Sequence, residues 1–246
     1  MYRFFVEPDQ IEEKWIRIRG SDVNHIKNVL RCRIGEEIRV SAQGDREYAC
    51  CIEQIDEDEI LAEILYIQEN GMELTSRIYL FQGIPKGDKM EWIIQKAVEL
   101  GVYEVIPVDT KRSVVKLDRK KKENKIRRWQ AISESAAKQS KRMIIPKISP
   151  VLTFDQAADR ADSLDVCLIP YELAKGFQKT RSIMEGIRPG QSIGIFIGPE
   201  GGFDEKEVKL AIEHKIVPIT LGRRILRTET AGMTVLSILM YLLEGK

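Results

Sequence analysis

The segment "SIGIFIGPEGGFDEKE", Ser192 to Glu207, joins an apolar run to a charged stretch through a turn that contains three glycines and a proline. The run is rich in β-branched and aromatic residues, which favours a strand. Asp204 precedes Glu207 by three residues, a pattern typical of a capping box at the start of a helix. A strand that passes through a tight loop into a helix predicts an α/β fold, in which ligands bind beyond the carboxyl ends of the strands.

The same alternation of strands and helices extends from Arg77 to the end of the chain and predicts a mainly parallel sheet. Asp88, with Glu91 three residues later, predicts a second capping box. The final helix is apolar on nearly every face, which indicates burial inside the domain or against a second subunit. Strands are predicted at residues 77–82, 104–109, 166–170, 193–198 and 217–222, and helices at 88–100, about 122–140, after 204 and at 230–243.

The first part of the chain has a different texture. Short apolar runs such as "RFFV", "EIRVSA" and "ILAEILYI" are separated by turn-like segments, which favours a small β-barrel or sandwich with one short helix at residues 22–31. The polar stretch "QENGMELTS" contains Asn70-Gly71 and is typical of a linker. We therefore predict two domains, residues 1–71 and 72–246.

The length and composition, 246 residues with 43% hydrophobic and 31% charged, are typical of a soluble globular protein. The N-terminus does not resemble a leader, and no window approaches the roughly 20 apolar residues of a membrane-spanning helix. A cytoplasmic protein without membrane contact is expected. The four cysteines lack C-x-x-C spacing and the two histidines are far apart in sequence, so no metal is expected and the thiols should be reduced and mostly buried.

The net charge of +1 hides a strong asymmetry along the chain. Lys111 to Lys147 carries fourteen Lys/Arg against three Asp/Glu, whereas Glu53 to Glu73 has eight acids and no Lys or Arg. A local basic excess in a nearly neutral chain indicates contact with phosphates. A solvated helix face explains a charge run of this kind equally simply.

The glycine loop, Gly198 to Gly202, suits a ligand that the main chain contacts, because glycine permits positive φ and close approach to the backbone. The loop lacks the Lys-Ser/Thr of a phosphate-binding loop and the G-x-G-x-x-G spacing of a dinucleotide site, which weakens both nucleotide interpretations. A tight turn without a ligand explains the loop alone about as well.

Two further strand ends are expected at the same edge of the sheet. The segment "LGRRILRTETA" puts Ile225 and Leu226 in an exposed loop, where they either form a pocket wall for a flat group such as adenine or fill the core beneath. The segment "CLIPYELAKG" offers Tyr171 and Glu172. Three convergent loops favour a binding site more than any one of them does.

Together these motifs resemble the RsmE family of ribosomal RNA methyltransferases, in the SPOUT superfamily. The resemblance rests on "IGPEGGF" followed by "LGRRILRTETA", with "QKAVELGV" (Gln95 to Val102) and "ESAAKQSKR" (Glu134 to Arg142) before them. In the first domain "RFFV", "HIKNVLRCRIGEEIRV" and "GDREY" are similar to the family's PUA-like barrel, so nearly the whole chain is covered. The resemblance implies a SPOUT-type parallel sheet with a C-terminal trefoil knot, preceded by a PUA-like β-barrel, in a homodimer.

The resemblance also implies S-adenosylmethionine as cofactor and methylation of N3 of a specific uridine in 16S ribosomal RNA, with that RNA or the small ribosomal subunit as partner. An adenosyl group packed against the main chain would explain the missing side chains of "GPEGG". The residues that the resemblance assigns to the cofactor are Pro170, Tyr171, Glu172, Ile197, Gly198, Pro199, Glu200, Gly201, Gly202, Leu221, Gly222, Ile225 and Leu226.

Methylation at N3 requires loss of the ring proton, so the site needs a base or a cation that stabilises the anion. Arg227 is the first choice for the cation, and Glu229 is a candidate proton acceptor that also suits a helix start through the helix dipole. Glu200 equally suits ordering of its own loop. Candidate phosphate contacts are Arg3, His25, Arg31, Arg112, Lys116, Arg128, Lys141 and Arg142.

Three alternatives stay open at this point. A related SPOUT enzyme could act on transfer RNA or on a ribose hydroxyl. A non-catalytic RNA-binding protein would explain the basic segment and the barrel, but gives no reason for three loops at one sheet edge. Another α/β enzyme that uses a nucleotide would explain the loops, but the phosphate motifs that it needs are missing.

Overall fold

The computed structural model describes residues 2–42, 46–68, 73–115 and 118–244. The chain forms two compact units, Met1–Glu73 with Ala137–Ile145, and Leu74–Ala136 with Pro146–Lys246. The predicted domain boundary at residue 71 lies outside the described residues. The short segment Ala137–Ile145 belongs with the N-terminal unit, although its place in the sequence predicts the second domain.

The N-terminal unit is a five-stranded sheet folded around one apolar core. Its elements are β1 (Arg3–Phe5), a 3-10 turn (Pro8–Gln10), β2 (Trp15–Arg19), α1 (Ser21–Asn24), a π-helical turn (His25–Val29), β3 (Glu37–Ser41), β4 (Glu47–Ile55) and β5 (Glu59–Gln68). The strand order is β1-β3-β4-β5-β2, parallel only between β1 and β3. Alternate residues such as Ile16 and Ile18 are fully buried, as expected of strands with one face in a core. The single helix predicted at 22–31 is instead α1 followed by the π-helical turn.

The C-terminal unit contains a wholly parallel sheet in the order β12-β10-β11-β6-β7-β8, with β9 also paired to β7. Its elements are β6 (Arg77–Gly83), α2 (Lys89–Glu99), β7 (Glu104–Asp109), α3 (Arg119–Gln139), β8 (Lys147–Ile148), β9 (Leu152–Thr153), α4 (Phe154–Ala161), β10 (Val166–Pro170), α5 (Phe177–Glu185), β11 (Ser192–Ile197), α6 (Glu205–Glu213), β12 (Val217–Ile219) and α7 (Thr228–Leu243). All five predicted strands are present. Strand β12 ends earlier than predicted because the Thr220 amide turns away to donate to Thr180 Oγ1 of α5 (3.1 Å).

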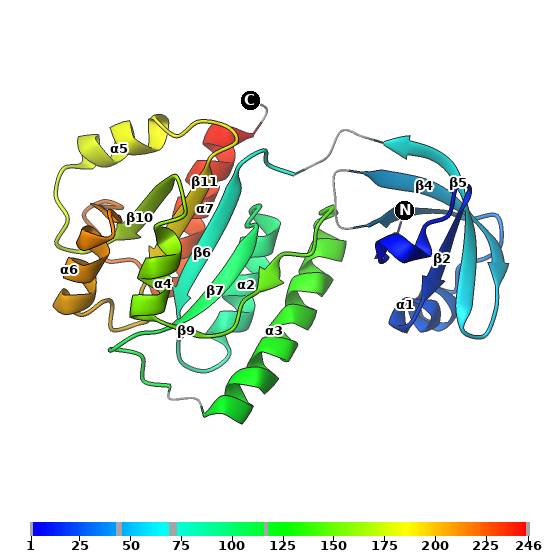
Figure 1. Ribbon diagram of the computed structural model, residues 1–246, viewed down its shortest axis with the longest axis horizontal. Helices are drawn as coiled ribbons and strands as arrows, with labels where there is room; N and C mark the ends of the chain where they lie inside the picture. Colours follow the sequence, from blue (N-terminus) through cyan, green and yellow to red (C-terminus); the bar gives the residue numbers. More distant parts are fainter. Residues whose placement is uncertain (1, 43–45, 69–72, 116–117, 245–246) are drawn as a thin grey trace. The chain divides into compact units, whose positions relative to one another are not determined.

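Helices cover both faces of this sheet (Figure 1). Helices α4 and α6 pack together on one face, and α2 and α7 pack together on the other. On the α4 side, the rings of Phe81 and Phe196 stack with centroids 4.2 Å apart, and Phe154 packs against both Phe196 and Phe203. Because Phe203 directly follows the glycine loop, this aromatic core fixes the end of the loop that leads into α6.

The described cysteines are free thiols, as predicted. Cys32, Cys50 and Cys167 are buried, and Cys51 is half-buried. Burial raises the pKa of Cys50 to about 12 and that of Cys167 to about 11. These thiols therefore stay protonated at neutral pH and behave as small apolar side chains.

The two predicted capping boxes have different outcomes. At α6 the box is confirmed, since the Asp204 carboxylate accepts from the Lys206 amide (3.2 Å) and Glu207 accepts from the Asp204 amide (2.8 Å). At α2 the prediction was wrong. Asp88 is the N-cap residue but its side chain makes no capping bond, because its backbone is not extended and the Glu91 carboxylate pairs with Arg128 instead (2.8 Å).

This difference predicts unequal effects of two matched substitutions. Asp204→Ala should lower the Tm by about 2–4 °C, because it removes a working cap, whereas Asp88→Ala should change it by less than about 1 °C. The Lys206 amide and the Lys111 ammonium hold the pKa of Asp204 below its usual value. Its stabilisation is therefore present at neutral pH and disappears as the pH falls through that depressed pKa, so the Tm difference should close in acid. Calorimetric scans of the three proteins at several pH values check this. Equal Tm values for the two variants at pH 7 would contradict it.

Candidate active site

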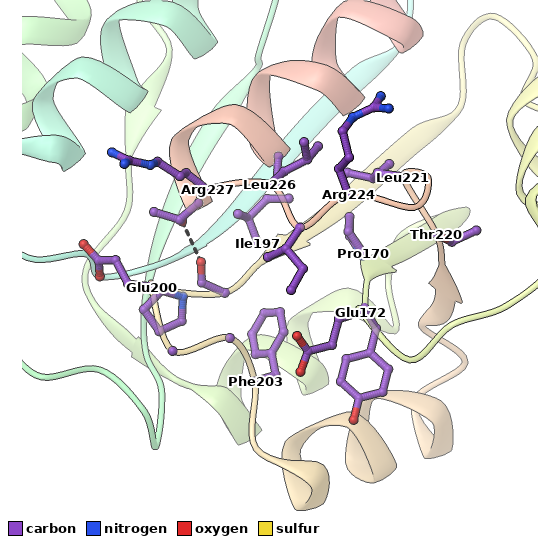
Figure 2. Close-up of a pocket in the computed structure, with 18 of the residues that line it drawn as sticks. Pro170, Glu172, Ile197, Glu200, Phe203, Thr220, Leu221, Arg224, Leu226 and Arg227 are labelled. Atoms are coloured by element: carbon purple, nitrogen blue, oxygen red, sulfur yellow. Dashed lines mark hydrogen bonds between the residues drawn. The ribbon is translucent and has the colours of Figure 1, made fainter.

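A cavity of about 540 Å³ opens at the carboxyl edge of the parallel sheet, within the C-terminal unit (Figure 2). Three segments wall it: the end of β10, the glycine loop after β11, and the loop from Thr220 to Thr228 that joins β12 to α7. Every residue that the sequence assigned to the cofactor lies on this lining. The structure confirms that the three predicted loops converge at one edge of the sheet.

The glycines of the loop are required first by the loop itself. A Cβ on Gly198 would lie 3.1 Å from the backbone of Gly202, and a Cβ on Gly201 would lie 3.2 Å from the Arg112 side chain. Gly202 has a φ of +66°, which side-chain-bearing residues rarely adopt. The explanation of these missing side chains by a packed adenosyl group is therefore not needed, because the loop folds back on its own backbone.

A buried hydrogen-bond chain ties the glycine loop to the start of α7. The Thr228 hydroxyl donates to the Gly198 carbonyl oxygen (2.6 Å) and accepts from the Gln82 amide nitrogen at the end of β6 (2.9 Å). Gln82 and Thr228 are 0% and 5% exposed, so breaking either bond would leave a polar group unpaired in the core. These bonds thus join two segments of the cavity wall, the glycine loop and the start of α7, to the end of β6.

The loop between β12 and α7 supplies both apolar and cationic groups. Ile197 and Leu226 both line the cavity, and Figure 2 shows the Arg224 side chain extending away from the other labelled side chains. Ile225 is 86% exposed, an unusual position for an aliphatic side chain that also lines a cavity. Such a residue is available to cover a partly apolar ligand.

Charged side chains gather at the rim formed by the β6–α2 loop and the start of α7. The Lys89 ammonium lies 2.9 Å from Glu200 Oε1 and 3.8 Å from Glu229 Oε2. Arg227 lines the cavity, and Figure 2 shows it on the same side as Glu200. Glu229 is not one of the lining residues, and its Oε2 is buried without a hydrogen-bond partner among the described residues. The two predicted catalytic residues, Arg227 and Glu229, therefore lie near the same group of charged side chains as Glu200.

The pKa of Glu200 is lowered, although its partial burial acts in the opposite direction. Hydrogen bonds from Lys89 and from the Glu200 and Lys86 amides outweigh that burial. Glu200 is therefore a firmly ionised anchor. This agrees with the simpler interpretation of Glu200 as a residue that orders its loop.

Several residues of the lining were not predicted from the sequence. The most informative is Lys89, the first residue of α2, which follows the central strand β6. The rule that located the other loops, that ligands bind beyond the carboxyl ends of parallel strands, also pointed to "GIPKGDK" after β6. The other lining residues that were not predicted are Phe203, Thr220, Thr228 and Ala231, whereas Arg223 and Arg224 lie within the predicted segment Leu221 to Leu226.

Two of the candidate phosphate contacts are buried in the N-terminal unit. The Arg142 guanidinium binds the Glu73 carboxylate at 2.6 to 2.9 Å, and Arg3 pairs with Glu47 and donates to the Arg142 carbonyl oxygen. Their side chains are only 6% and 7% exposed. These arginines hold the segment Ala137–Ile145 in the N-terminal unit, and their burial leaves little guanidinium for an RNA phosphate.

The other candidate phosphate contacts differ in exposure. His25 is half-buried with its ring edge-on to Phe4, and Lys116 lies outside the described residues. Arg112 donates to the Gly201 carbonyl oxygen (3.0 Å) and Arg128 pairs with Glu91. The exposed members are Arg31, Arg112, Arg128 and Lys141.

Two kinds of feature are absent from the described residues. No group of three or more His, Cys, Asp or Glu side chains is arranged to hold a metal ion among them. Within the same residues, no helix combines the length and apolar content required to cross a bilayer.

The fold and the cavity are those of an RNA methyltransferase. The family profile of the RNA methyltransferase domain matches residues 72–240, and that of the RNA methyltransferase PUA domain matches residues 18–65. The predicted α/β fold with a PUA-like first domain is thereby confirmed, whereas the trefoil knot stays a prediction.

The chain belongs to the family of ribosomal RNA small subunit methyltransferase E. It is 39% identical to the protein of that name from Bacillus subtilis, over 99% of this chain and 98% of the relative. It is 32% identical to the Neisseria gonorrhoeae protein of the same name, crystallised with S-adenosylmethionine, with a TM-score of 0.86 and 98% of both chains covered. A Legionella pneumophila methyltransferase with the same bound cofactor is 30% identical, with a TM-score of 0.85 and 98% and 97% covered.

Proposed function

We propose that this protein transfers a methyl group from S-adenosylmethionine to N3 of a uridine in 16S ribosomal RNA. The observation that carries the proposal is the single cavity built by all three loops, in a chain of the ribosomal RNA small subunit methyltransferase E family. The family supports a ribosomal RNA substrate. The N3 position of uridine is the more specific part of the proposal.

The lining of the cavity suits S-adenosylmethionine. A volume of about 540 Å³ is typical of a small-molecule site. Pro170, Ile197 and Leu226 supply apolar walls for the adenine ring, and the exposed Ile225 would cover it. The backbone of Gly198 to Gly202 offers polar groups without side chains in the way. When bound, S-adenosylmethionine supplies an electrophilic methyl group on a sulfonium.

The rim cluster suits the acceptor base. Arg227 is a cation on the lining and would stabilise negative charge that develops on the uracil ring. Glu229 lies outside the lining but 3.8 Å from the lining residue Lys89, and it is the acceptor that we propose for the N3 proton. Holding the two reacting atoms in line supplies most of the remaining rate acceleration.

RNA would be bound by both units through phosphate contacts. The proposed contacts are the exposed Arg31, Arg112, Arg128 and Lys141, together with His25 and Lys116. We also propose a homodimer, because α7 exposes Ile238 and Tyr241 and the neighbouring helix α2 exposes Trp92. A cytoplasmic location follows from the proposed ribosomal substrate.

Methylation of transfer RNA or of a ribose hydroxyl is the second candidate. A ribose hydroxyl would not need a delocalised ring anion, so the two cations at the rim favour a base as acceptor. The alternative of a non-catalytic RNA-binding protein does not account for the cavity.

The test is methyl transfer from labelled S-adenosylmethionine to small ribosomal subunits that lack the mark, and to free ribosomal RNA. The modified nucleoside is then identified by mass spectrometry. N3-methyluridine from either substrate supports the proposal. A different methylated nucleoside, or transfer to transfer RNA alone, would move the protein to the second candidate.

A further inference from the structure

Lys89 lines the cavity but has no part in the roles proposed for Arg227 and Glu229. It is the first residue of α2, and its side chain lines the cavity and is 38% exposed. Its ammonium lies near two carboxylates, 2.9 Å from Glu200 in the glycine loop and 3.8 Å from Glu229 in the first turn of α7. A lysine side chain is flexible, so this placement needs an anchor, and Glu200 provides it.

Lys89 acts as a cation at this site. Its pKa is raised, chiefly by the hydrogen bond with Glu200, while partial desolvation and the nearby charge of Arg227 act in the opposite direction. The groups that face Lys89 are therefore Glu200, Glu229 and Arg227. The ammonium form persists at neutral pH, and Lys89 can donate hydrogen bonds but cannot take the N3 proton.

The chemistry of uracil calls for more than one cation. The ring N–H is a much weaker acid than a carboxylic acid, so a carboxylate alone removes the proton only at a large cost in free energy. The resulting negative charge is shared by N3 and the two flanking carbonyl oxygens. A cation beside those oxygens lowers the pKa of the ring, because a nearby opposite charge favours the ionised form.

We propose that Lys89 is a second catalytic cation, whose ammonium contacts a uracil carbonyl oxygen and stabilises the N3 anion together with Arg227. This inference rests on the proposed function, because only an acceptor that loses a ring proton needs it. Glu200 is then a positioning residue, which holds the ammonium at the rim of the cavity.

The proton balance is simple. The N3–H bond breaks with its electron pair left on the ring, and the proton passes to the Glu229 carboxylate. The N3 lone pair would then form the bond to the methyl carbon while the methyl–sulfur bond breaks, with its electron pair left on sulfur and S-adenosylhomocysteine as the leaving group. Glu229 releases its proton to solvent after the product leaves. Lys89 and Arg227 keep their protons throughout, so their whole effect is on the stability of the ring anion.

The test compares single-turnover methyl transfer by wild type, Lys89→Gln, Lys89→Arg and Lys96→Gln on unmethylated small subunits. Lys96 lies on the same helix and pairs with Glu99, so its variant controls for the loss of one positive charge. Lys89→Gln should slow the step about 100-fold at saturating RNA, with the Kd for S-adenosylmethionine unchanged. Lys89→Arg should restore most of the rate, and Lys96→Gln should match wild type.

Two further measurements distinguish a catalytic role of the Lys89 cation from a purely structural role. In Lys89→Gln the pH at which the rate levels off should move upward, because the bound ring ionises less readily. The difference in methyl-transfer rate between wild type and Lys89→Gln should be smaller on subunits reconstituted with 5-fluorouridine, because its N3 is more acidic.

The outcomes distinguish the role of Lys89 from the proposed function. A wild-type rate for Lys89→Gln would overturn the role of Lys89 and leave the proposed function standing. A slow Lys89→Gln with an unshifted pH profile and no gain from 5-fluorouridine would also overturn it. A wild-type product other than N3-methyluridine would overturn the proposed function, and with it the need for Lys89.

Discussion

Arg227→Ala is expected to lower the rate of methyl transfer by about 10²–10³ at saturating RNA and cofactor. Arg227 is the N-cap residue of α7, its side chain makes no capping bond, and it lines the cavity near Lys89. Its guanidinium is therefore available to the ring anion, and losing one preorganised donor of this kind costs about that much. Single-turnover kinetics with labelled cofactor, beside calorimetric binding of S-adenosylhomocysteine, measure the rate and the affinity separately.

Arg224→Ala is the comparison for this variant. Arg224 lies in the same loop, is exposed and projects outward in Figure 2, so it suits a phosphate contact. Its loss should raise the KM for RNA and reduce the salt dependence of binding, with kcat nearly unchanged. If Arg227→Ala behaves in the same way, then Arg227 binds RNA and takes no part in the chemistry.

Local patterns predicted the fold of the C-terminal unit well. Strand order cannot be read from local patterns, but five of the seven strands described for this sheet could be, because β-branched and aromatic runs favour strands. The two-residue strands β8 and β9 and the helices α4 and α5 were not predicted. The capping box at Asp204 was found because all of its bonds lie within four residues. The one proposed at Asp88 failed because Glu91 pairs with Arg128, a partner 37 residues away in sequence that no local pattern reveals.

The same distinction explains the site. Lining residues on the three loops were predictable, because strand ends in a parallel sheet share an edge. The pairing of Arg142 with Glu73 was not predictable, since 69 residues separate them. The side chains of Arg3 and Arg142, which look like phosphate contacts in the sequence, are almost fully covered in the structure. The position of Lys89 between Glu200 and Glu229 depends likewise on contacts across more than 100 residues.

Gly83→Ala is expected to weaken binding of S-adenosylmethionine by at least about tenfold, although Gly83 is not on the cavity lining. A Cβ at this position, the end of β6, would lie 2.6 Å from Pro199 Cδ and 2.7 Å from Pro199 N. Neither atom can rotate away, because one is in a proline ring and the other in the backbone. The glycine loop must shift, which strains the bond between Thr228 and the Gly198 carbonyl. Overpacking of this kind costs about 1–3 kcal/mol of stability.

Gly232→Ala is the matched control for Gly83→Ala. The difference in cofactor affinity between the two variants measures the effect of the clash with Pro199. A Cβ on Gly232 would meet Ile197 at 3.7 Å and Gln82 at 3.8 Å, ordinary contacts beside the same loop. Because Gly232 lies inside α7, alanine should leave binding unchanged and raise the Tm slightly. Calorimetric titration below the Tm of both variants measures the affinities. Tight binding by Gly83→Ala would mean that the loop moves freely as a body, and that the site is not fixed by the contact between Gly83 and Pro199.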